Sequence, residues 1–447
     1  MSVKTQKASP GLTVLASSAI FFLISLDTLI TNVALPTIAQ ELGGSMTMQQ
    51  WVVDGYTLAF ASLLLFCGNL SDRFGAHLMF VAGTAAFGVS SVFCSFANSM
   101  EMLVAGRALL GVSAAMVLPP SMAVIREAYT DDTERARALG LWMSGGSVAA
   151  AAGPLAGGIL TPIHWSLVFW VNVPVCLIVL VLARRIAASP TQVSPFDIPG
   201  QILATLGIVS LVGGIIEGGE LGYTAQAILA AMAAGVVMLA AFVVRQGHAA
   251  NPMMPLGLFK ARGMRVALFC GFAFILSWFG TVFLVTQYLQ NGLELTPFIA
   301  GLAFVPSSIG AFAGNVGAGR ASARWGARPV MMFGLAIEAI ALVLFAVLGP
   351  TLDLYSTMAV VCLAGLGGSV TMPPASGLVL SCATPEQSGI ASAVFNTFRQ
   401  VGASIGVAVF GSILAMSSSM GAGLSTSFAI AAVIVVCALV SVARLRN

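Results

Sequence analysis

Long apolar segments alternate with short polar connections along the whole chain, and this pattern predicts a series of membrane-spanning helices. One helix needs roughly 20 predominantly apolar residues to cross a bilayer. We expect about fourteen such segments, joined by connections too short to form a separate domain. Their predicted limits are 12–36, 47–70, 77–97, 102–125, 138–160, 165–183, 199–218, 225–245, 265–288, 298–318, 329–349, 354–379, 388–416 and 424–443.

The composition supports a protein that resides in lipid. Of its 447 residues, 58% are hydrophobic and 8% are charged, whereas a soluble domain carries about 25% charged residues. The first apolar segment is too long for a signal-peptide core and lacks a small-residue cleavage site, so we expect it to be retained as a helix. The seven cysteines are scattered without a CxxC spacing and the three histidines are isolated. Neither residue type predicts a disulfide framework, a metal site or a cofactor.

The positive charges predict an orientation. If every segment crosses the membrane, seventeen of the nineteen lysines and arginines fall on one side. They are Lys4, Lys7, Arg73, Arg126, Arg135, Arg137, Arg184, Arg185, Arg245, Lys260, Arg262, Arg265, Arg320, Arg324, Arg328, Arg444 and Arg446. The opposite connections hold acids instead, namely Glu41, Glu101, Glu217, Glu220, Glu294 and Asp353. Because cytoplasmic loops are enriched in lysine and arginine, both termini are expected in the cytoplasm, with the protein in the cytoplasmic membrane.

Two internal matches indicate that the chain is duplicated. The segment 68–76 resembles 319–327, which lies 251 residues later, and 111–120 resembles 365–374 at an offset of 254 residues. Six segments therefore correspond to six others, and the pair at 199–245 is inserted between them. Such parallel repeats are typical of transporters that bind substrate between their halves.

Asp27 is the charge around which the prediction is built. It falls near the middle of the first apolar segment, where a carboxylate costs at least about 2.5–3.5 kcal/mol to insert. It is interpreted either as a proton or cation site in a polar interior or as a purely structural hydrogen-bonding group.

Three further charged residues fall inside or close to apolar segments. Arg107 is expected to face the bundle and meet a carboxylate, with Asp27 as a candidate partner; the alternative is that it extends to the membrane interface. Glu338 is either a second proton carrier or a structural group. Arg399, near Asn396 and Gln400, favours an interhelical contact rather than a site.

Trp51 and Asp54 open the second segment and share a helix face. An aromatic ring with a carboxylate suits a lipophilic cation, through cation–π contact and charge pairing. The alternative is an interfacial tryptophan beside a solvated aspartate.

Two glycine-containing stretches are candidate gating elements. The first, Gly68 to Gly75 with Asp72 and Arg73, lies at the end of the second segment, and its repeat makes it more specific than an ordinary tight turn. The second is the small-residue run of the fifth segment. It contains Gly153, Pro154, Gly157 and Gly158. Small residues permit close helix packing and Pro154 removes one backbone donor, so this helix is either a packing element, a bendable gate or both.

Together these motifs resemble the major facilitator superfamily, in particular its fourteen-helix drug:proton antiporters. The likeness extends over Leu26–Pro36, the Gly68–Gly75 loop, Arg107 to Ala115 and Gly153–Gly158. The Trp51, Asp54 and Tyr56 set is similar to exporters of quaternary ammonium compounds. The resemblance implies an all-α membrane protein with two six-helix bundles and two inserted helices. The implied division is 1–198 for the first bundle, 199–245 for the inserted pair, 246–264 for a cytoplasmic linker and 265–447 for the second bundle.

The expected function is proton-coupled export of lipophilic, cationic drugs or antiseptics by alternating access. Asp27, Arg107 and Glu338 would couple protons, and Asp27, Trp51 and Asp54 would bind substrate. The expected partners are a small molecule, protons and the lipid bilayer, without nucleic acid, for a protein acting as a monomer. Export of one dedicated metabolite, antibiotic or siderophore is the alternative. A membrane enzyme is disfavoured because the sequence offers no nucleophile–base pair and no metal cluster.

Overall fold

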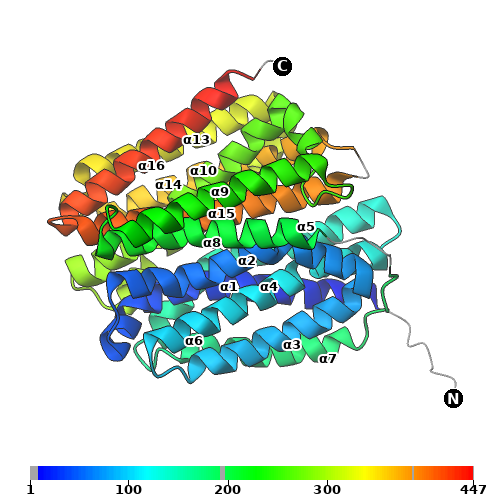
Figure 1. The fold of residues 1–447 in the computed structure, drawn as a ribbon, viewed down its shortest axis with the longest axis horizontal. Coiled ribbons are helices and arrows are strands. Elements are labelled where there is room, and N and C mark those ends of the chain that lie inside the picture. The colour runs from blue at the N-terminus through cyan, green and yellow to red at the C-terminus, as the bar shows by residue number, and fades with distance from the viewer. Residues whose placement is uncertain (1–8, 192–196, 385–386, 446–447) are drawn as a thin grey trace.

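The computed structural model describes residues 9–191, 197–384 and 387–445, and these residues form helices without any β-strand (Figure 1). The α-helices are α1 (Pro10–Leu42), α2 (Met46–Phe74), α3 (Ala76–Ser95), α4 (Met100–Ala128), α5 (Asp132–Leu160), α6 (Leu167–Trp170), α7 (Asn172–Ala183), α8 (Ile198–Leu221), α9 (Gln226–His248), α10 (Arg262–Gln287), α11 (Pro297–Leu302), α12 (Val305–Trp325), α13 (Ala327–Leu348), α14 (Leu354–Ser381), α15 (Ser388–Met416) and α16 (Met420–Ala443). Shorter turns are η1 (Leu256–Lys260), η2 (Tyr288–Gly292) and η3 (Gly349–Thr351).

The predicted all-α membrane protein is confirmed. Within the described residues, thirteen helices are long and apolar enough to cross a bilayer, and a shorter apolar helix covers Leu167–Ala183. We call α1–α7 the first half and α10–α16 the second half. The end of the bundle where α1 meets α2 is called the α1–α2 end, and the opposite end, where α1 begins, is called the N-terminal end.

Some predicted limits were wrong because helices continue past their apolar cores. Glu217 and Glu220 were assigned to a connection, although 217 lies within the predicted segment 199–218; the structure places both in the last turns of α8, which continues to Leu221. Arg320 and Arg324 likewise lie inside α12 rather than after it. The cations Lys4, Lys7 and Arg446 fall outside the described residues.

Polar side chains fix where several helices begin. The hydroxyl oxygens of Ser45 and Ser99 accept hydrogen bonds from backbone N–H groups of the first turns of α2 and α4. Asp131 caps α5 and Asp353 caps α14 in the same way. The first N–H groups of a helix have no partner inside it, so these caps stabilise the first turn. They mark where each helix begins, which the hydrophobic pattern alone does not define.

The duplication is visible in the backbone. Gly75 ends α2 with φ 91°, and its N–H donates to Ser71 O at 2.9 Å. Gly326 ends α12 with φ 86°, and its N–H donates to Ser322 O at 2.9 Å. Both positions need the conformational freedom of glycine. The proline pairs of the second repeat also both lie inside helices, in α4 and α14.

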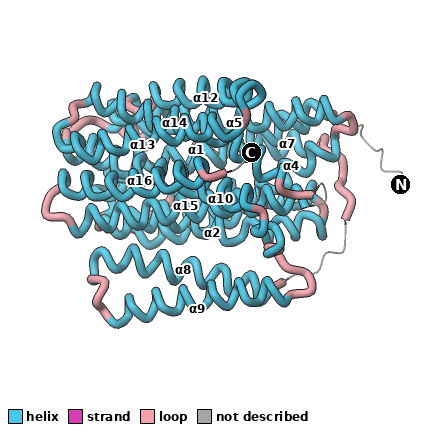
Figure 2. Tube along the Cα trace, turned by 90° about the horizontal axis from the view of Figure 1, so that it is seen from above, coloured by secondary structure: helices cyan, strands magenta, loops and turns pink. Residues whose placement is uncertain are grey.

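The helices α8 and α9 lie side by side along one flank of the bundle (Figure 2). α8 contacts both halves, since Gln201 Nε2 donates to Ser62 O of α2 at 2.7 Å and Ser412 Oγ of α15 donates to Ile215 O at 2.9 Å. The inserted pair therefore covers the seam between α2 and α15.

Asp197 fixes the start of α8. Its carboxylate accepts hydrogen bonds from Gly200 N–H at 3.0 Å, Arg245 Nε at 2.6 Å and Gln246 Nε2 at 2.7 Å. Burial by itself would raise the pKa of Asp197, but these hydrogen bonds and the Arg245 charge outweigh it and hold the pKa below its usual range.

Candidate functional site

A buried ion pair lies inside the first half. Arg107 Nη1 of α4 and Asp27 Oδ2 of α1 are 2.5 Å apart, and their side chains are 1% and 0% exposed. The other carboxylate oxygen accepts a 2.8 Å hydrogen bond from Asn172 Nδ2 of α7, which also donates to Ser91 Oγ of α3. The pair therefore ties together α1, α4, α7 and α3.

Backbone and aromatic groups complete the surroundings of Arg107. Its Nε donates to Val52 O of α2 at 3.0 Å, and its Cζ lies 4.4 Å from the centre of the Tyr56 ring. A guanidinium that is fully enclosed in this way does not extend to the membrane interface. Of the two alternatives for Arg107, the structure therefore shows the one that faces the bundle and meets Asp27.

The two buried charges of this pair depend on each other. Removing one partner of a buried pair typically costs about 3–5 kcal/mol, because the other charge is left uncompensated. Each charge of the pair therefore holds the other in place, and the coupling role of both residues stays a prediction.

Asp54 lies buried where α2 meets α15 of the second half. Its Oδ1 accepts a 3.0 Å hydrogen bond from Thr57 Oγ1, while Oδ2 has no hydrogen-bond partner among the described residues. Ser404 of α15 lies beside the same carboxyl group. The alternative of a solvated aspartate does not hold, since Asp54 is 0% exposed.

Trp51 points to a different neighbour. Its indole Nε1 donates to Glu217 Oε1 of α8 at 2.7 Å, and its ring lies against Gly213 of the same helix. Although Trp51 and Asp54 are one turn apart, the structure directs one to α8 and the other to α15. Their joint role as a cation site stays a prediction.

Glu338 is a second buried carboxylate, in α13 of the second half. One oxygen accepts a hydrogen bond from Ser277 Oγ of α10, and Oε2 has no partner among the described residues. The structure does not bring Glu338 together with Asp27, which lies in the other half. Its proton-carrying role stays a prediction.

The first candidate gating element packs within its own half. Asp72 and Arg73 are exposed in the last turn of α2, and Gly68 lies more than a turn earlier. A Cβ added at Gly75 would come within 3.2 Å of the carbonyl oxygen of Ser189, which follows α7. Close packing at this turn thus requires glycine, while a gating role is untested.

The second candidate element, in α5, contacts both halves. A Cβ added at Gly153 or Gly157 would come within 2.7 and 2.9 Å of α1. One added at Gly158 would come within 2.9 Å of the α11 backbone, and one added at Gly301 of α11 would come within 2.3 Å of Pro154 O. The glycines thus let α5 approach α1 on one face and the second half on another.

Pro154 also releases a carbonyl group. Proline has no N–H, so the carbonyl of Ala150, four residues earlier, loses its helical donor. Ser308 Oγ of α12 donates to this oxygen at 2.8 Å. The group that Pro154 leaves unsatisfied therefore forms a hydrogen bond between the halves.

Glutamine side chains form the other described hydrogen bonds between the halves, near the α1–α2 end. Gln50 Nε2 of α2 donates to two carbonyl oxygens of α15 at 2.8 and 3.2 Å. Gln287 Nε2 donates to Gln49 Oε1 at 2.5 Å, and Gln290 Nε2 donates to a carbonyl oxygen of α1 at 2.9 Å. These neutral groups join the halves at that end.

The sequence analysis did not single out these glutamines, Asn172 or Ser308. The available signal was the set of side-chain amides in or beside apolar segments, since a buried amide needs hydrogen-bond partners. Amides carry no charge, however, so one inside an apolar segment is a weaker signal of a site than an aspartate at the same depth.

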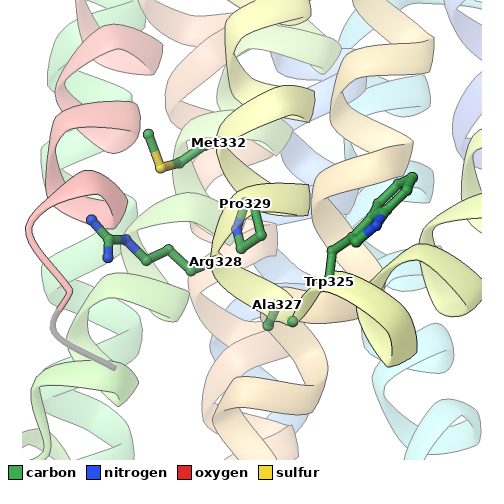
Figure 3. Close-up of a pocket in the computed structure, with 6 residues that line it drawn as sticks. Trp325, Ala327, Arg328, Pro329 and Met332 are labelled. Carbon is green, nitrogen blue, oxygen red and sulfur yellow. The ribbon is translucent and has the colours of Figure 1, made fainter.

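No group of three histidine, cysteine, aspartate or glutamate side chains that could hold a metal ion occurs in the described part of the chain. A shallow surface hollow lies where α12 turns into α13, as Figure 3 shows. It is lined by Trp325, Gly326, Ala327, Arg328, Pro329 and Met332. None of the predicted site residues is among them.

Comparison with known proteins gives consistent relatives along the chain. The family model described as Major Facilitator Superfamily matches residues 18–259 and 267–447. The methylenomycin A resistance protein of Bacillus subtilis is 33% identical over 431 residues, covering 96% of this chain and 92% of that protein. The multidrug efflux pump LfrA of Mycolicibacterium smegmatis is 34% identical over 394 residues, covering 88% and 78% respectively.

A solved structure shares the fold. The crystal structure of a POT family transporter in complex with 5-aminolevulinic acid superposes with a TM-score of 0.72, covering 96% of this chain and 95% of that one, at 14% sequence identity.

Proposed function

Because this chain belongs to the major facilitator superfamily, we propose that it exports lipophilic drug-like molecules in exchange for protons. Membership makes it a transporter rather than an enzyme, as the sequence predicted. Its relatives include proteins named for antibiotic resistance and multidrug efflux, which supports drugs as the cargo.

The observation that carries the proton coupling is the enclosed pair of Asp27 and Arg107. In the proposed cycle, a proton from outside neutralises Asp27, Arg107 is freed from its carboxylate, and the helices joined by the pair rearrange. Loss of the proton to the cytoplasm restores the pair. Glu338, with its free buried oxygen, is proposed as a second group that takes up a proton.

Asp54 is the proposed contact for a cationic substrate. Its Oδ2 lacks a described partner at the boundary between the halves, so a cation that reaches it gains a charge-assisted hydrogen bond. Asp27 would add to this site only when it is released from Arg107. Trp51 would contribute only after it leaves Glu217.

Transport is proposed to proceed by alternating access, with residues 1–198 and 265–447 moving as two bundles in the cytoplasmic membrane. With both termini in the cytoplasm, the α1–α2 end faces outward. The hydrogen bonds of the glutamines near that end favour assigning the structure to an inward-facing state. The Gly68–Gly75 loop and α5 would then reposition as the halves rotate. The monomer is the proposed functional unit.

The test is uptake of ethidium into inverted vesicles energised by a proton gradient. Wild-type protein should accumulate the dye, and a protonophore should abolish accumulation. Asp27→Asn should abolish it too, but this change also strands the Arg107 charge. The double variant Asp27→Asn, Arg107→Gln removes both charges and should fold yet remain uncoupled. Asp353→Asn, at an exposed helix cap, is the control. Accumulation that survives a protonophore, or that persists in a folded double variant, refutes the proposal.

Export of one dedicated metabolite or antibiotic is the second candidate. It is favoured by the engagement of Trp51 with Glu217, which occupies the aromatic part of the predicted cation site. A protein of this kind would act on a single neutral or anionic compound. Its transport would be unaffected by Asp54→Asn.

A further inference from the structure

Two arginines lie deep inside the membrane helices, and they differ in whether a carboxylate neutralises them. Arg107 is neutralised by Asp27 at 2.5 Å. Arg399 of α15 makes one described hydrogen bond, from Nη1 to the uncharged Asn396 Oδ1 at 3.0 Å. No described carboxylate forms an ion pair with Arg399. The second half thus holds a guanidinium whose charge is not compensated by the described residues.

The unsatisfied side of this guanidinium is the one that recognises acids. Arg399 Nε is shut off from the surface and has no hydrogen-bond partner among the described residues. With Nη1 bound to Asn396, the remaining edge consists of Nε and Nη2. Two parallel N–H groups on one edge match the two oxygens of a carboxylate.

Arg399 lies too deep along α15 for its guanidinium simply to extend to the membrane surface. Arg399 lies eleven residues after Ser388, where α15 begins, which corresponds to about 16 Å along the helix. The aliphatic part of the Arg399 side chain passes α10 at Gly271. A Cβ added to Gly271 would come within 3.3 Å of Arg399 Cγ. Glycine at that position makes room for the side chain to lie between the helices.

The neighbourhood is otherwise apolar and aromatic. The Phe395 ring centre is 5.8 Å from Arg399 Cζ. On the following turns, Ala403 packs with Phe274 and Ile275 of α10, and the Phe274 ring stacks on Trp278. A cation edge beside aromatic rings suits a molecule with an apolar body and one acidic group.

The position along the proposed route is also suitable. Arg399 is five residues from Ser404, the α15 neighbour of Asp54, and so lies about 7–8 Å nearer the N-terminal end. Asn396 and Arg399 are each partly exposed, whereas Nε itself is covered, so a carboxylate that reaches the side chain must displace part of this cover to meet Nε. With the halves joined near the α1–α2 end, a substrate coming from the other end meets Arg399 before Asp54.

We propose that the Nε–Nη2 edge of Arg399, between α10 and α15, binds the carboxylate of an apolar, acid-bearing substrate. This deepens the proposed function by naming a substrate class, and it rests on that function only in requiring that small molecules enter the bundle. Compounds that also carry a positive charge would place that charge toward Asp54.

The test is equilibrium binding of radiolabelled 2-naphthoate and of its neutral isostere 2-naphthamide to the full chain in nanodiscs of zwitterionic lipid. Wild-type protein should bind 2-naphthoate about 10- to 100-fold more tightly than the amide, the range expected for a charge-assisted pair of hydrogen bonds. Arg399→Gln should remove this preference, and Arg399→Lys should retain part of it. Gln226→Leu, at an exposed position of α9, should leave it unchanged.

Two further readouts keep the result specific. The preference should be constant between pH 6 and 8, whereas recognition through a protonating carboxylate of the protein would vary. Folding of each variant is checked by its thermal unfolding without ligand.

Equal binding of the two compounds, no binding of either, or an unchanged preference in folded Arg399→Gln overturns the proposal. An anionic lipid as the true occupant would instead appear as 2-naphthoate binding abolished by phosphatidylglycerol in the nanodisc, which also overturns it. Since no proton gradient is used, this outcome is independent of the vesicle test of coupling.

Discussion

Replacing Gln50 by leucine tests whether neutral amides hold the halves together at the α1–α2 end. Gln50 Nε2 lies within 3.4 Å of three acceptors on α15, the carbonyl oxygens of Val407 and Ala408 and the hydroxyl of Ser412. An amide nitrogen carries two hydrogens, so two of these contacts are full hydrogen bonds at a time. Leucine is apolar and one bond shorter, and it removes both.

The magnitude follows from this count. A hydrogen bond contributes a net of about 0.5–1.5 kcal/mol, so the loss of two amounts to about 1–3 kcal/mol. If the bonds exist only in the state closed at the α1–α2 end, the ratio of the two states changes by about 5- to 150-fold. Gln50 Oε1 is buried without a described partner, and its removal offsets part of this loss.

The assay measures the separation of the two halves directly. Spin labels at Gly140 of α5 and Gly319 of α12, both facing open space near the N-terminal end, report their distance in a variant lacking the native cysteines. Wild-type protein should populate the long distance, and Gln50→Leu should add a shorter one as the N-terminal end closes. Gln226→Leu, at an exposed position of α9, is the control. A distance distribution identical to that of the control refutes the role given to Gln50.

Three more variants address the other contacts. Gly301→Ala pushes a methyl group against Pro154 O and should weaken the closed state by about 1–3 kcal/mol, seen as growth of the shorter distance with the same labels. Trp51→Phe removes a hydrogen bond to a charged acceptor, worth about 1.5–3 kcal/mol, so thermal stability should fall while substrate affinity is kept if Trp51 anchors α8; a large loss of affinity with unchanged stability would instead identify it as a ligand. Asp197 has a lowered folded-state pKa, so its stabilising contribution is present above about pH 4 and is lost as the pH falls through the folded value. Asp197→Asn should therefore lower stability at pH 7 and flatten its dependence between pH 5 and 3; the same slope in both proteins would contradict this.

The sequence was most informative where burial is costly. A carboxylate and a guanidinium placed in separate apolar segments had to be compensated, so the pairing of Asp27 with Arg107 could be proposed from the positions of these two residues along the chain. The repeat was readable from two sequence matches at nearly the same offset, and the structure gives a reason for its glycines, because Gly75 and Gly326 end helices in a conformation that favours glycine. The prediction of the ion pair rests on a physical requirement that leaves few alternatives.

Side-chain direction was much harder to read. Trp51 and Asp54 are three residues apart and were expected to serve one ligand, yet the large indole turned outward to α8, whose position depends on the tertiary packing of the inserted pair. The predicted segment 199–218 also ends before α8 does, since Glu220 and Leu221 remain helical. Periodicity along one helix does not define which neighbour covers which face.

The distribution of charge between the halves has a mechanistic consequence. The ion pair of Asp27 and Arg107 lies wholly within the first half, whereas the described hydrogen bonds between the halves use amides, a hydroxyl and backbone carbonyls. Separating neutral groups costs about 1 kcal/mol each, but separating a buried ion pair costs several times more. The hydrogen bond between Ser308 and the Ala150 carbonyl, which Pro154 leaves without a helical donor, is one of these neutral contacts. It can break without leaving a charge unpaired. In the proposed cycle the halves would therefore rock apart on weak contacts while the strong contact responds to a proton, and this separation of roles would let protonation bias a motion that thermal energy can drive.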